Sequence, residues 1–310
     1  MTGLDSPPVR YAIDLHSHTY YSDGRPSPAE LVEQAAAQGL RTLAITDHDN
    51  ARATREVRPL AQRRGVELPP AVEVTCRWDA SGAPPWDSDI DVLGYFLDID
   101  SPSFLRFEQA CLADLAERYT RRCAVLTGAG YPVSLEQVLA QNPRYPGALP
   151  LLDTLVTLGH ARDFREALRL LDAHRDGMPV CALSIDQAIA AIRAEGGVAV
   201  LAHPSLVRWR GGALDARAIA RLADMGLQGL EIYHHRLDAA ARAHFLRLAR
   251  QHDLLITGGS DEHGWPEGLP RLGSQPVTRQ MLAALAALAG QAISPKGGVK
   301  GERFYSRGGL

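Results

Sequence analysis

Four apolar segments of strand type end in histidine, or in aspartate with histidine close by, and this pattern constrains the fold more than any other feature. The first runs from Tyr11 to His18 and ends in two histidines separated by Ser17. On a β-strand alternate side chains share a face, so His16 and His18 point the same way while Ser17 points away. The other three segments are residues 45–48, 198–204 and 256–263. A single ending of this kind is commonly a hydrogen-bonded surface or core histidine, but four in register predict side chains that converge on one site.

The segments between these endings alternate between strand and helix. Residues 10–15 are predicted to form a strand, residues 27–38 a helix and residues 42–46 a second strand. Ser27 is a good N-cap and Glu30 completes a capping box, which marks the start of the helix. Because a strand, a helix and a strand with a short return form a βαβ unit, we expect the first two strands to be parallel. Further strands are expected at residues 71–74, 90–95, 198–201, 230–233 and 254–257. About seven strand–helix units with polar residues at strand C-termini indicate an α/β protein of the (β/α) barrel type.

A helical segment interrupts this alternation. Residues 104–126 have the pattern of one long amphipathic helix, and the stretch 102–179 contains no convincing strand. We therefore interpret residues 102–179 as an all-helical insertion between two parts of the barrel, residues 10–101 and 180–292. The Gly-rich tail, residues 293–310, is expected to be frayed.

The composition excludes several classes of partner. The 310 residues carry a net charge of −3, so a general attraction to long nucleic acids or anionic membranes is not expected. Any anionic ligand must therefore be held locally, by metals or by individual arginines. The four cysteines have no CxxC spacing, which is typical of thiols in a reducing compartment. With no signal-peptide pattern and no apolar run long enough to span a bilayer, the sequence predicts a cytoplasmic protein.

The polar residues at the strand ends are candidate metal ligands. They are imidazoles and carboxylates without thiolates, a donor set that suits Mn, Fe, Zn or Mg. The candidates are His16, His18, Asp23, His48, Glu73, Asp91, His203, Asp261 and His263. One catalytic zinc needs three or four ligands, so this number of donors favours two or three metal ions that share a bridging carboxylate. Such a centre binds an ester phosphate and lowers the pKa of a bound water. We interpret Asp47 as a residue that holds an imidazole, because His48 follows it directly.

The strand-end residues form an ordered set of short motifs. In chain order they are His16-Ser17-His18, Ser22-Asp23-Gly24, Thr46-Asp47-His48, Glu73, Ala202-His203-Pro204 and residues 259–263. This set resembles the PHP (polymerase and histidinol phosphatase) family of metal-dependent phosphoesterases, which are related to amidohydrolases. The resemblance implies a distorted (β/α)7 barrel with a trinuclear metal site.

The resemblance also implies a role for each ligand. A first metal would be bound by His16, His18, Glu73 and Asp261. Glu73 would bridge to a second metal held by His203, and a third would be held by Asp23, His48 and His263. We accordingly expect Asp261, His203 and Glu73 to be the catalytic residues.

Two positions depart from the small family members that the insertion resembles, which hydrolyse nucleotide phosphates or short oligonucleotides. Asp91 stands where those relatives usually have histidine, so the second metal site should be more anionic. The stretch Gly147-Ala148-Leu149-Pro150 lacks the arginine and histidine by which their insertion contacts substrate. Because an arginine fork suits phosphate oxygens, we expect the missing contacts from arginines and histidines elsewhere. The candidates are Arg208, Arg210, His234, His235 and Arg236.

The sequence thus predicts a metal-dependent phosphoesterase that acts on a small phosphorylated substrate, such as a nucleotide, another metabolite or a short oligonucleotide. Manganese is the favoured metal, ahead of Fe, Zn and Mg. With fewer recognition groups, the enzyme should prefer small phosphate esters to nucleoside 3',5'-bisphosphates. Three alternatives stay open: histidinol phosphate as the substrate, amidohydrolase-like hydrolysis of C–N or C–O bonds, and a metal-bound regulatory module without turnover.

Overall fold

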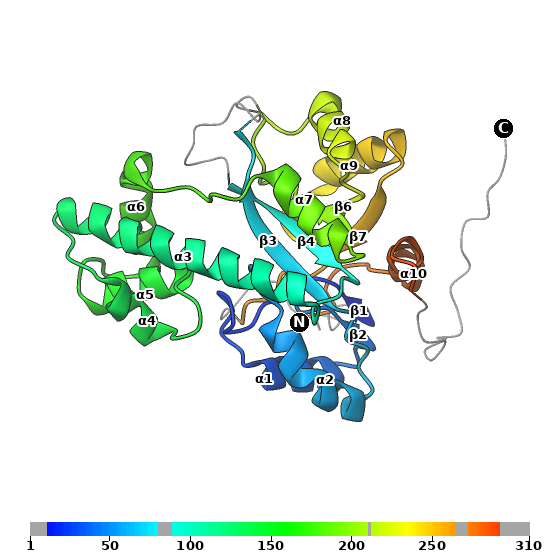
Figure 1. Ribbon diagram of the computed structural model, residues 1–310, viewed down its shortest axis with the longest axis horizontal. Coiled ribbons are helices and arrows are strands. Elements are labelled where there is room, and N and C mark those ends of the chain that lie inside the picture. Colours follow the sequence, from blue (N-terminus) through cyan, green and yellow to red (C-terminus); the bar gives the residue numbers. More distant parts are fainter. Residues whose placement is uncertain (1–10, 80–88, 210–211, 265–271, 292–310) are drawn as a thin grey trace, which may run out of the picture.

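The computed structural model describes residues 11–79, 89–209, 212–264 and 272–291, and these residues form seven strands in two sheets (Figure 1). In the smaller sheet β1 (Ile13–Asp14) pairs in parallel with β2 (Thr42–Leu43). The larger sheet contains, in spatial order, β3 (Ala71–Arg77), β4 (Asp89–Tyr95), β5 (Val198–Leu201), β6 (Gly229–Tyr233) and β7 (Leu255–Gly258). All seven strands were expected from the sequence, and the parallel pairing of the first two is confirmed.

The larger sheet is mixed. β4 runs antiparallel to both β3 and β5, whereas β5, β6 and β7 are parallel to one another. Antiparallel neighbours can be joined by a short connection, but parallel neighbours need a crossover of about a dozen residues or more. The parallel order of strands in a regular (β/α) barrel is therefore interrupted at β4.

Two isolated parallel bridges join the sheets at the points where strands end. Ser17, just after β1, pairs with Glu262, just after β7, and His48, after β2, pairs with Glu73 in β3. The amide of Asp261 also donates to the carbonyl oxygen of His16 at 2.9 Å. These contacts bring the ends of β1, β2 and β7 close to Glu73 in β3, and so bring together residues that are far apart in the sequence.

Helices cover the outer face of the larger sheet. The helices α7 (Ile185–Ala194), α8 (Ala216–Asp224) and α9 (Ala239–Gln251) share one hydrophobic cluster with strand residues such as Val74 and Val92. Leu93 and Val200, which point to the other face, belong to a second cluster. This second cluster also contains residues of α10 (Arg279–Leu288), so the sheet is packed on both faces.

The helices α1 (Pro28–Ala37) and α2 (Arg52–Arg64) pack against the smaller sheet. The start of α1 is set by Ser27, which accepts a hydrogen bond from the amide of Glu30, while the Glu30 carboxylate accepts one from the amide of Ser27. The capping box expected from the sequence is therefore confirmed.

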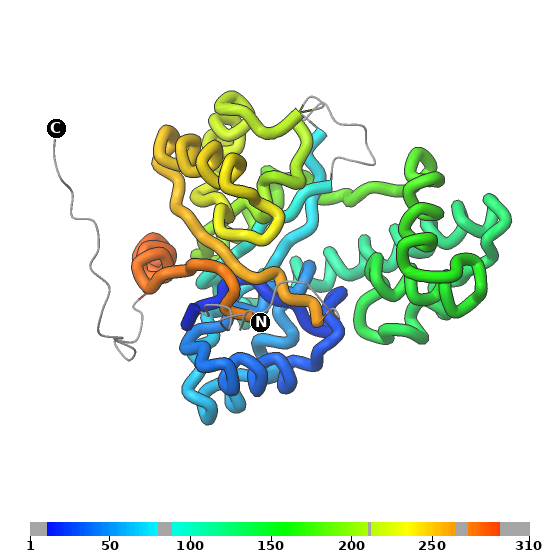
Figure 2. Tube along the Cα trace, turned by 180° about the vertical axis from the view of Figure 1, so that it is seen from behind, coloured from blue at the N-terminus to red at the C-terminus, as the bar shows by residue number. Residues whose placement is uncertain are grey.

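Residues 102–179 are helical and lie to one side of the two sheets (Figures 1 and 2). They form α3 (Pro102–Gly128), α4 (Leu135–Gln141), α5 (Ala148–Thr157), α6 (Phe164–Ala173) and a 3-10 turn (Arg175–Gly177). These helices have a hydrophobic core of their own, to which Leu126 and Leu155 belong. In the described parts of the chain, no helix has the length and apolarity needed to cross a membrane.

Candidate metal centre

A cluster of histidines and carboxylates lies where the strands end. We call it the strand-end cluster and define it as His16, His18, Asp23, His48, Glu73, Asp91, His203, Asp261 and His263. Glu73 lies in β3 and Asp91 lies in β4. Thr75 of β3 pairs with Asp91, so their side chains lie on the same face of the sheet. Because alternate residues of a strand point the same way, Glu73 lies on that face too. All nine candidate ligands predicted from the sequence are brought together here.

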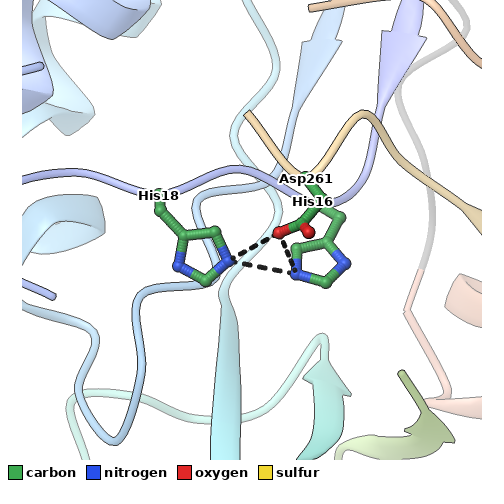
Figure 3. Close-up of side chains that lie close together, drawn as sticks. All are labelled: His16, His18 and Asp261. Carbon is green, nitrogen blue, oxygen red and sulfur yellow. Dashed lines mark hydrogen bonds and ion pairs between the residues drawn. The ribbon is translucent and has the colours of Figure 1, made fainter. Parts of the chain in front are cut away.

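Four donor atoms of the cluster surround one point, and three of the four residues are drawn in Figure 3. The Nε2 atoms of His16 and His18 lie 3.1 Å apart. Each is also 3.1 Å from Oε2 of Glu73 and 3.3 Å from Oδ1 of Asp261. Ligands that each lie about 2.1 Å from one metal ion are roughly 3.0 to 3.4 Å from one another. The spacing of these four atoms therefore fits a shared metal ion.

Hydrogen bonds to the Nδ1 atoms of His16 and His18 fix the tautomer of each ring, and in the neutral rings they leave the Nε2 lone pair facing the cluster. His16 Nδ1 lies 2.9 Å from Oε1 of Glu231, and a carboxylate can only accept, so Nδ1 carries the proton. Ser22 Oγ donates its proton to Asp47 Oδ1 at 2.7 Å and therefore accepts from His18 Nδ1 at 3.2 Å. Asp47 thus supports an imidazole, as expected, but it supports that of His18 through Ser22 rather than that of its neighbour His48.

The resulting arrangement is unfavourable without a cation. When both imidazoles are neutral, the lone pairs of His16 Nε2 and His18 Nε2 face one another and the carboxylates of Glu73 and Asp261. Like charges and lone pairs at this spacing repel, unless protons or a metal ion lie between them. The donor chemistry of the site therefore fits a divalent metal ion.

Glu73 connects this group of donors to the rest of the cluster. Its Oε2 atom faces His16 and His18 and lies 3.6 Å from Nε2 of His48. Its other oxygen, Oε1, lies 3.1 Å from Nε2 of His203. Asp91 stands between His48 and His203, at 3.8 Å from His48 Nδ1 and 3.9 Å from His203 Nε2. One buried carboxylate thus faces two neighbouring sets of ligands.

Asp23 is the centre of a third set of donors. Its Oδ1 atom lies 3.2 Å from His263 Nε2, and its Oδ2 atom lies 3.8 Å from His48 Nε2. His263 donates from Nδ1 to the carbonyl oxygen of Asp261 at 2.9 Å, so Nε2 is the nitrogen that faces Asp23, and in the neutral ring it is the one with the lone pair.

Burial disfavours the charged forms of His48, His203, His263 and Asp23, but for these four residues neighbouring groups of opposite charge have the larger effect on the pKa. Although burial lowers the pKa of His48 and of His203, the carboxylate of Glu73, together with that of Asp91, raises each to about 9. Likewise burial lowers the pKa of His263, and Asp23 and Asp261 raise it to about 10. For Asp23, burial raises the pKa, yet His263 and His48 hold it well below its usual range. At neutral pH the metal-free cluster therefore holds protonated imidazoles beside ionised carboxylates, and metal binding must displace protons.

The residues expected to bind substrate lie in different places. His234 is fully buried, and its Nε2 atom lies 3.2 Å from Asp261 Oδ2. His235 is half-buried beside it, and burial together with His234 lowers the pKa of His235 to about 4, so its ring is neutral. The side chain of Arg236 is exposed, and its backbone amide donates to Nδ1 of His234. Arg208 is exposed near the end of the segment that follows His203, and Arg210 lies outside the described residues.

Sequence reasoning missed Glu231, which supports two members of the cluster. Its Oε1 atom accepts from His16 Nδ1, and its Oε2 atom accepts from the amide of His203 at 2.8 Å. The signal was present, because Glu231 is a single charged residue between Leu230 and Ile232 in a predicted strand. The same signal had singled out Glu73.

Asp14 was missed in the same way. This buried carboxylate accepts from the amides of Ser260 at 2.9 Å and Gly273 at 2.7 Å, and so ties β1 to the segments that follow β7. Asp14 is also a single charged residue in an apolar strand, between Ile13 and Leu15.

Comparison with known proteins gives matches over most of the chain. Residues 14–142 match the profile of a family described as PHP domain. The 5'-3' exoribonuclease Rnm of Escherichia coli (strain K12) is 33% identical over 270 residues, which are 82% of this chain and 87% of that protein. The 3',5'-nucleoside bisphosphate phosphatase of Chromobacterium violaceum is 30% identical over 262 residues, which are 83% of this chain and 88% of that protein.

A solved structure is similar over nearly the whole chain. It is a protein of Bifidobacterium adolescentis that has been provisionally named a metal-dependent phosphoesterase. It superposes with a TM-score of 0.78 at 28% sequence identity, and covers 91% of this chain and 98% of its own. The likeness therefore extends well beyond the strand-end motifs.

Proposed function

The chain belongs to the PHP family of metal-dependent phosphoesterases, and from this premise we propose that it hydrolyses a phosphate ester of a nucleotide or another small metabolite at a centre of two or three metal ions. The family inferred from the strand-end motifs is thereby confirmed. The finer points of substrate, metal and nuclearity are proposals that rest on the geometry of the strand-end cluster.

The position of Glu73 carries the proposal. Its two oxygens face different imidazoles at 3.1 Å, those of His16 and His18 on one side and that of His203 on the other. A carboxylate in this position would bridge two metal ions. The donors around Asp23 would hold a third. Divalent metals bound here supply Lewis acidity for the phosphate oxygens and lower the pKa of water.

Asp261 is the residue that we propose to move a proton. Its Oδ1 atom faces His16 and His18, while its Oδ2 atom accepts from Nε2 of His234 at 3.2 Å. Its backbone has a φ of +54°, a left-handed conformation that is uncommon outside glycine. A carboxylate held in this way can accept the proton of the attacking water and pass it to the leaving oxygen.

His234 has a tautomer unlike that of His16, His18 and His263. Its Nδ1 atom accepts the backbone N–H of Arg236 at 3.2 Å, so the proton of the neutral ring is on Nε2. We therefore propose that His234 is a donor that orients Asp261 rather than a metal ligand. His235, Arg208, Arg210 and Arg236 are kept as proposed contacts to substrate.

Manganese is the metal that we propose. The cluster offers imidazole and carboxylate donors without thiolate, and Asp91 adds a further carboxylate beside His48 and His203. Carboxylates favour harder cations such as Mn and Mg over the thiolate-binding metals.

The test is hydrolysis by metal-depleted protein that has been reloaded with Mn, Zn, Fe or Mg separately. The panel contains p-nitrophenyl phosphate, nucleoside monophosphates, a nucleoside 3',5'-bisphosphate, an amide and a lactone. We expect hydrolysis of phosphate esters after Mn loading, loss of that activity in Glu73→Gln, and no change in Glu136→Gln, whose carboxylate is exposed on α4. Hydrolysis of only the amide or the lactone would favour an amidohydrolase-like activity, and no turnover of any compound would contradict both.

A further inference from the structure

The loop that connects His18 to Asp23 carries two adjacent tyrosines, and the helical segment packs on this loop. Nδ2 of Asn142 donates to the carbonyl oxygens of Tyr20 at 2.8 Å and of Ser22 at 3.0 Å. A Cβ atom placed on Gly147 would lie 3.8 Å from Cβ of Asp23. Residues 142–147 therefore border the strand-end cluster directly.

Arg144 lies in the middle of this segment and covers the two tyrosines. Its guanidinium carbon is 4.2 Å from the ring centre of Tyr20 and 5.7 Å from that of Tyr21, and the two ring centres are 5.1 Å apart. The Tyr21 hydroxyl donates a hydrogen bond to Glu56 at 2.7 Å. We call Tyr20, Tyr21 and Arg144 the Tyr–Arg stack. It joins the loop after β1 to the helical segment beside the metal centre.

The charge of Arg144 is open to solvent. The residue is exposed, and within the described part of the chain its guanidinium forms no ion pair with a carboxylate. One face of the guanidinium lies over the Tyr20 ring, and the side chain as a whole is exposed. A guanidinium in this position can stack on a base and donate to a phosphate at the same time.

This combination is typical of sites for single-stranded nucleic acid. Such sites combine aromatic or guanidinium planes, which stack on bases of any sequence, with cations that contact the backbone. A mononucleotide whose phosphate is at the metal centre has no second phosphate to offer to Arg144, whereas the next nucleotide of a strand has one. The net charge of −3 provides no long basic track, so the contact is limited to a short strand.

We propose that the Tyr–Arg stack binds the second nucleotide of a short single-stranded RNA or DNA whose terminal phosphate ester reaches the metal centre. This inference rests on the proposed phosphoesterase function and adds to it a subsite for the second nucleotide of the substrate. In this arrangement Arg144 supplies a phosphate contact, which the stretch 147–150 cannot supply because it has neither arginine nor histidine.

The test compares kcat/KM for three substrates, p-nitrophenyl phosphate, a nucleoside monophosphate and a 5'-phosphorylated RNA trinucleotide. Arg144→Ala should lower kcat/KM for the trinucleotide at least tenfold and change the other two less than twofold. Tyr20→Ala should act in the same direction, and Tyr20→Phe should retain activity because the ring is kept. The matched control is Arg165→Ala, which removes an exposed arginine of α6 in the same helical segment.

Binding provides a readout that does not depend on turnover. Binding of a fluorescent trinucleotide to metal-free protein is measured by fluorescence anisotropy, and Arg144→Ala should bind it more weakly than the wild type. The slope of log affinity against log salt concentration should decrease by about the value of one phosphate contact. The inference is overturned if Arg144→Ala leaves trinucleotide binding and turnover unchanged, or lowers turnover of all three substrates equally. If the wild-type protein hydrolyses p-nitrophenyl phosphate but favours no strand over a mononucleotide, the inference fails while the proposed function stands. If nothing is hydrolysed, the proposed function fails and the anisotropy measurement alone decides the inference.

Discussion

His16 Nδ1 lies 2.9 Å from Oε1 of Glu231, although 215 positions separate the two residues in the sequence. The second oxygen of Glu231 accepts the amide proton of His203. One fully buried carboxylate therefore sets the ring orientation of His16 and the backbone position of His203, and both imidazoles face Glu73. Such outer contacts control metal affinity because they fix the tautomer and direction of the ligand.

Replacing Glu231 with glutamine should weaken metal binding by about 10- to 100-fold. The neutral amide lacks the negative charge with which the Glu231 carboxylate keeps the proton on His16 Nδ1. Titration of metal-free protein with Mn in competition with a chelator measures the effect. Glu231→Ala should in addition lower the free energy of unfolding by about 1 to 3 kcal/mol, because buried donors lose their acceptor. Unchanged Mn affinity in Glu231→Gln would show that the carboxylate does not support the site.

The substitutions His16→Ala, Glu73→Ala and Asp261→Ala should each reduce kcat to less than about a tenth of the wild-type value, since loss of one ligand usually costs more than that. Glu136→Ala, on the exposed side of α4, is the control. Metal content should be measured by elemental analysis beside kcat, and we expect two or three metal ions per wild-type chain after Mn loading. One metal ion or none in the wild-type protein would contradict the proposed centre.

Metal binding should strengthen with rising pH. The pKa values of His48 and His203 are raised to about 9 and that of His263 to about 10, so in the metal-free protein these rings are protonated at pH 7. Because a metal binds the neutral ring, affinity should increase by about tenfold per pH unit for each proton released, up to those pKa values. Mn titrations at pH 6, 7 and 8, and calorimetry in two buffers of different ionisation enthalpy, measure this release. A constant affinity from pH 6 to 8 would exclude it.

His234→Ala should lower kcat more than it changes KM, because its Nε2 proton orients Asp261 rather than the substrate. His234→Gln keeps a donor of similar reach and should recover a substantial part of kcat. Measuring kcat and KM for both variants with the same phosphate ester separates the two roles. If His234→Ala raised KM alone, the histidine would instead be a contact to substrate.

The sequence by itself predicted those features that depend on neighbouring residues. The capping box of Ser27 and Glu30 and the approximate positions of the seven strands follow from local patterns of polarity. The nine members of the strand-end cluster could be proposed because side chains alternate along a strand and because parallel strands end on one side of a sheet. These rules act over a few residues and need no knowledge of the complete fold.

The tertiary structure alone decided which distant groups meet. Several features involve partners that no local sequence pattern pairs. They are the antiparallel direction of β4, the hydrogen bond from His16 to Glu231, the hydrogen bonds that join Asp47 through Ser22 to His18, and the position of Arg144 over Tyr20. A buried carboxylate or an exposed arginine looks the same in the sequence whatever partner it has. Its partner is selected when the chain packs, because a buried polar group must find a hydrogen-bonding or charged counterpart, and the candidates are set by the three-dimensional course of the whole chain.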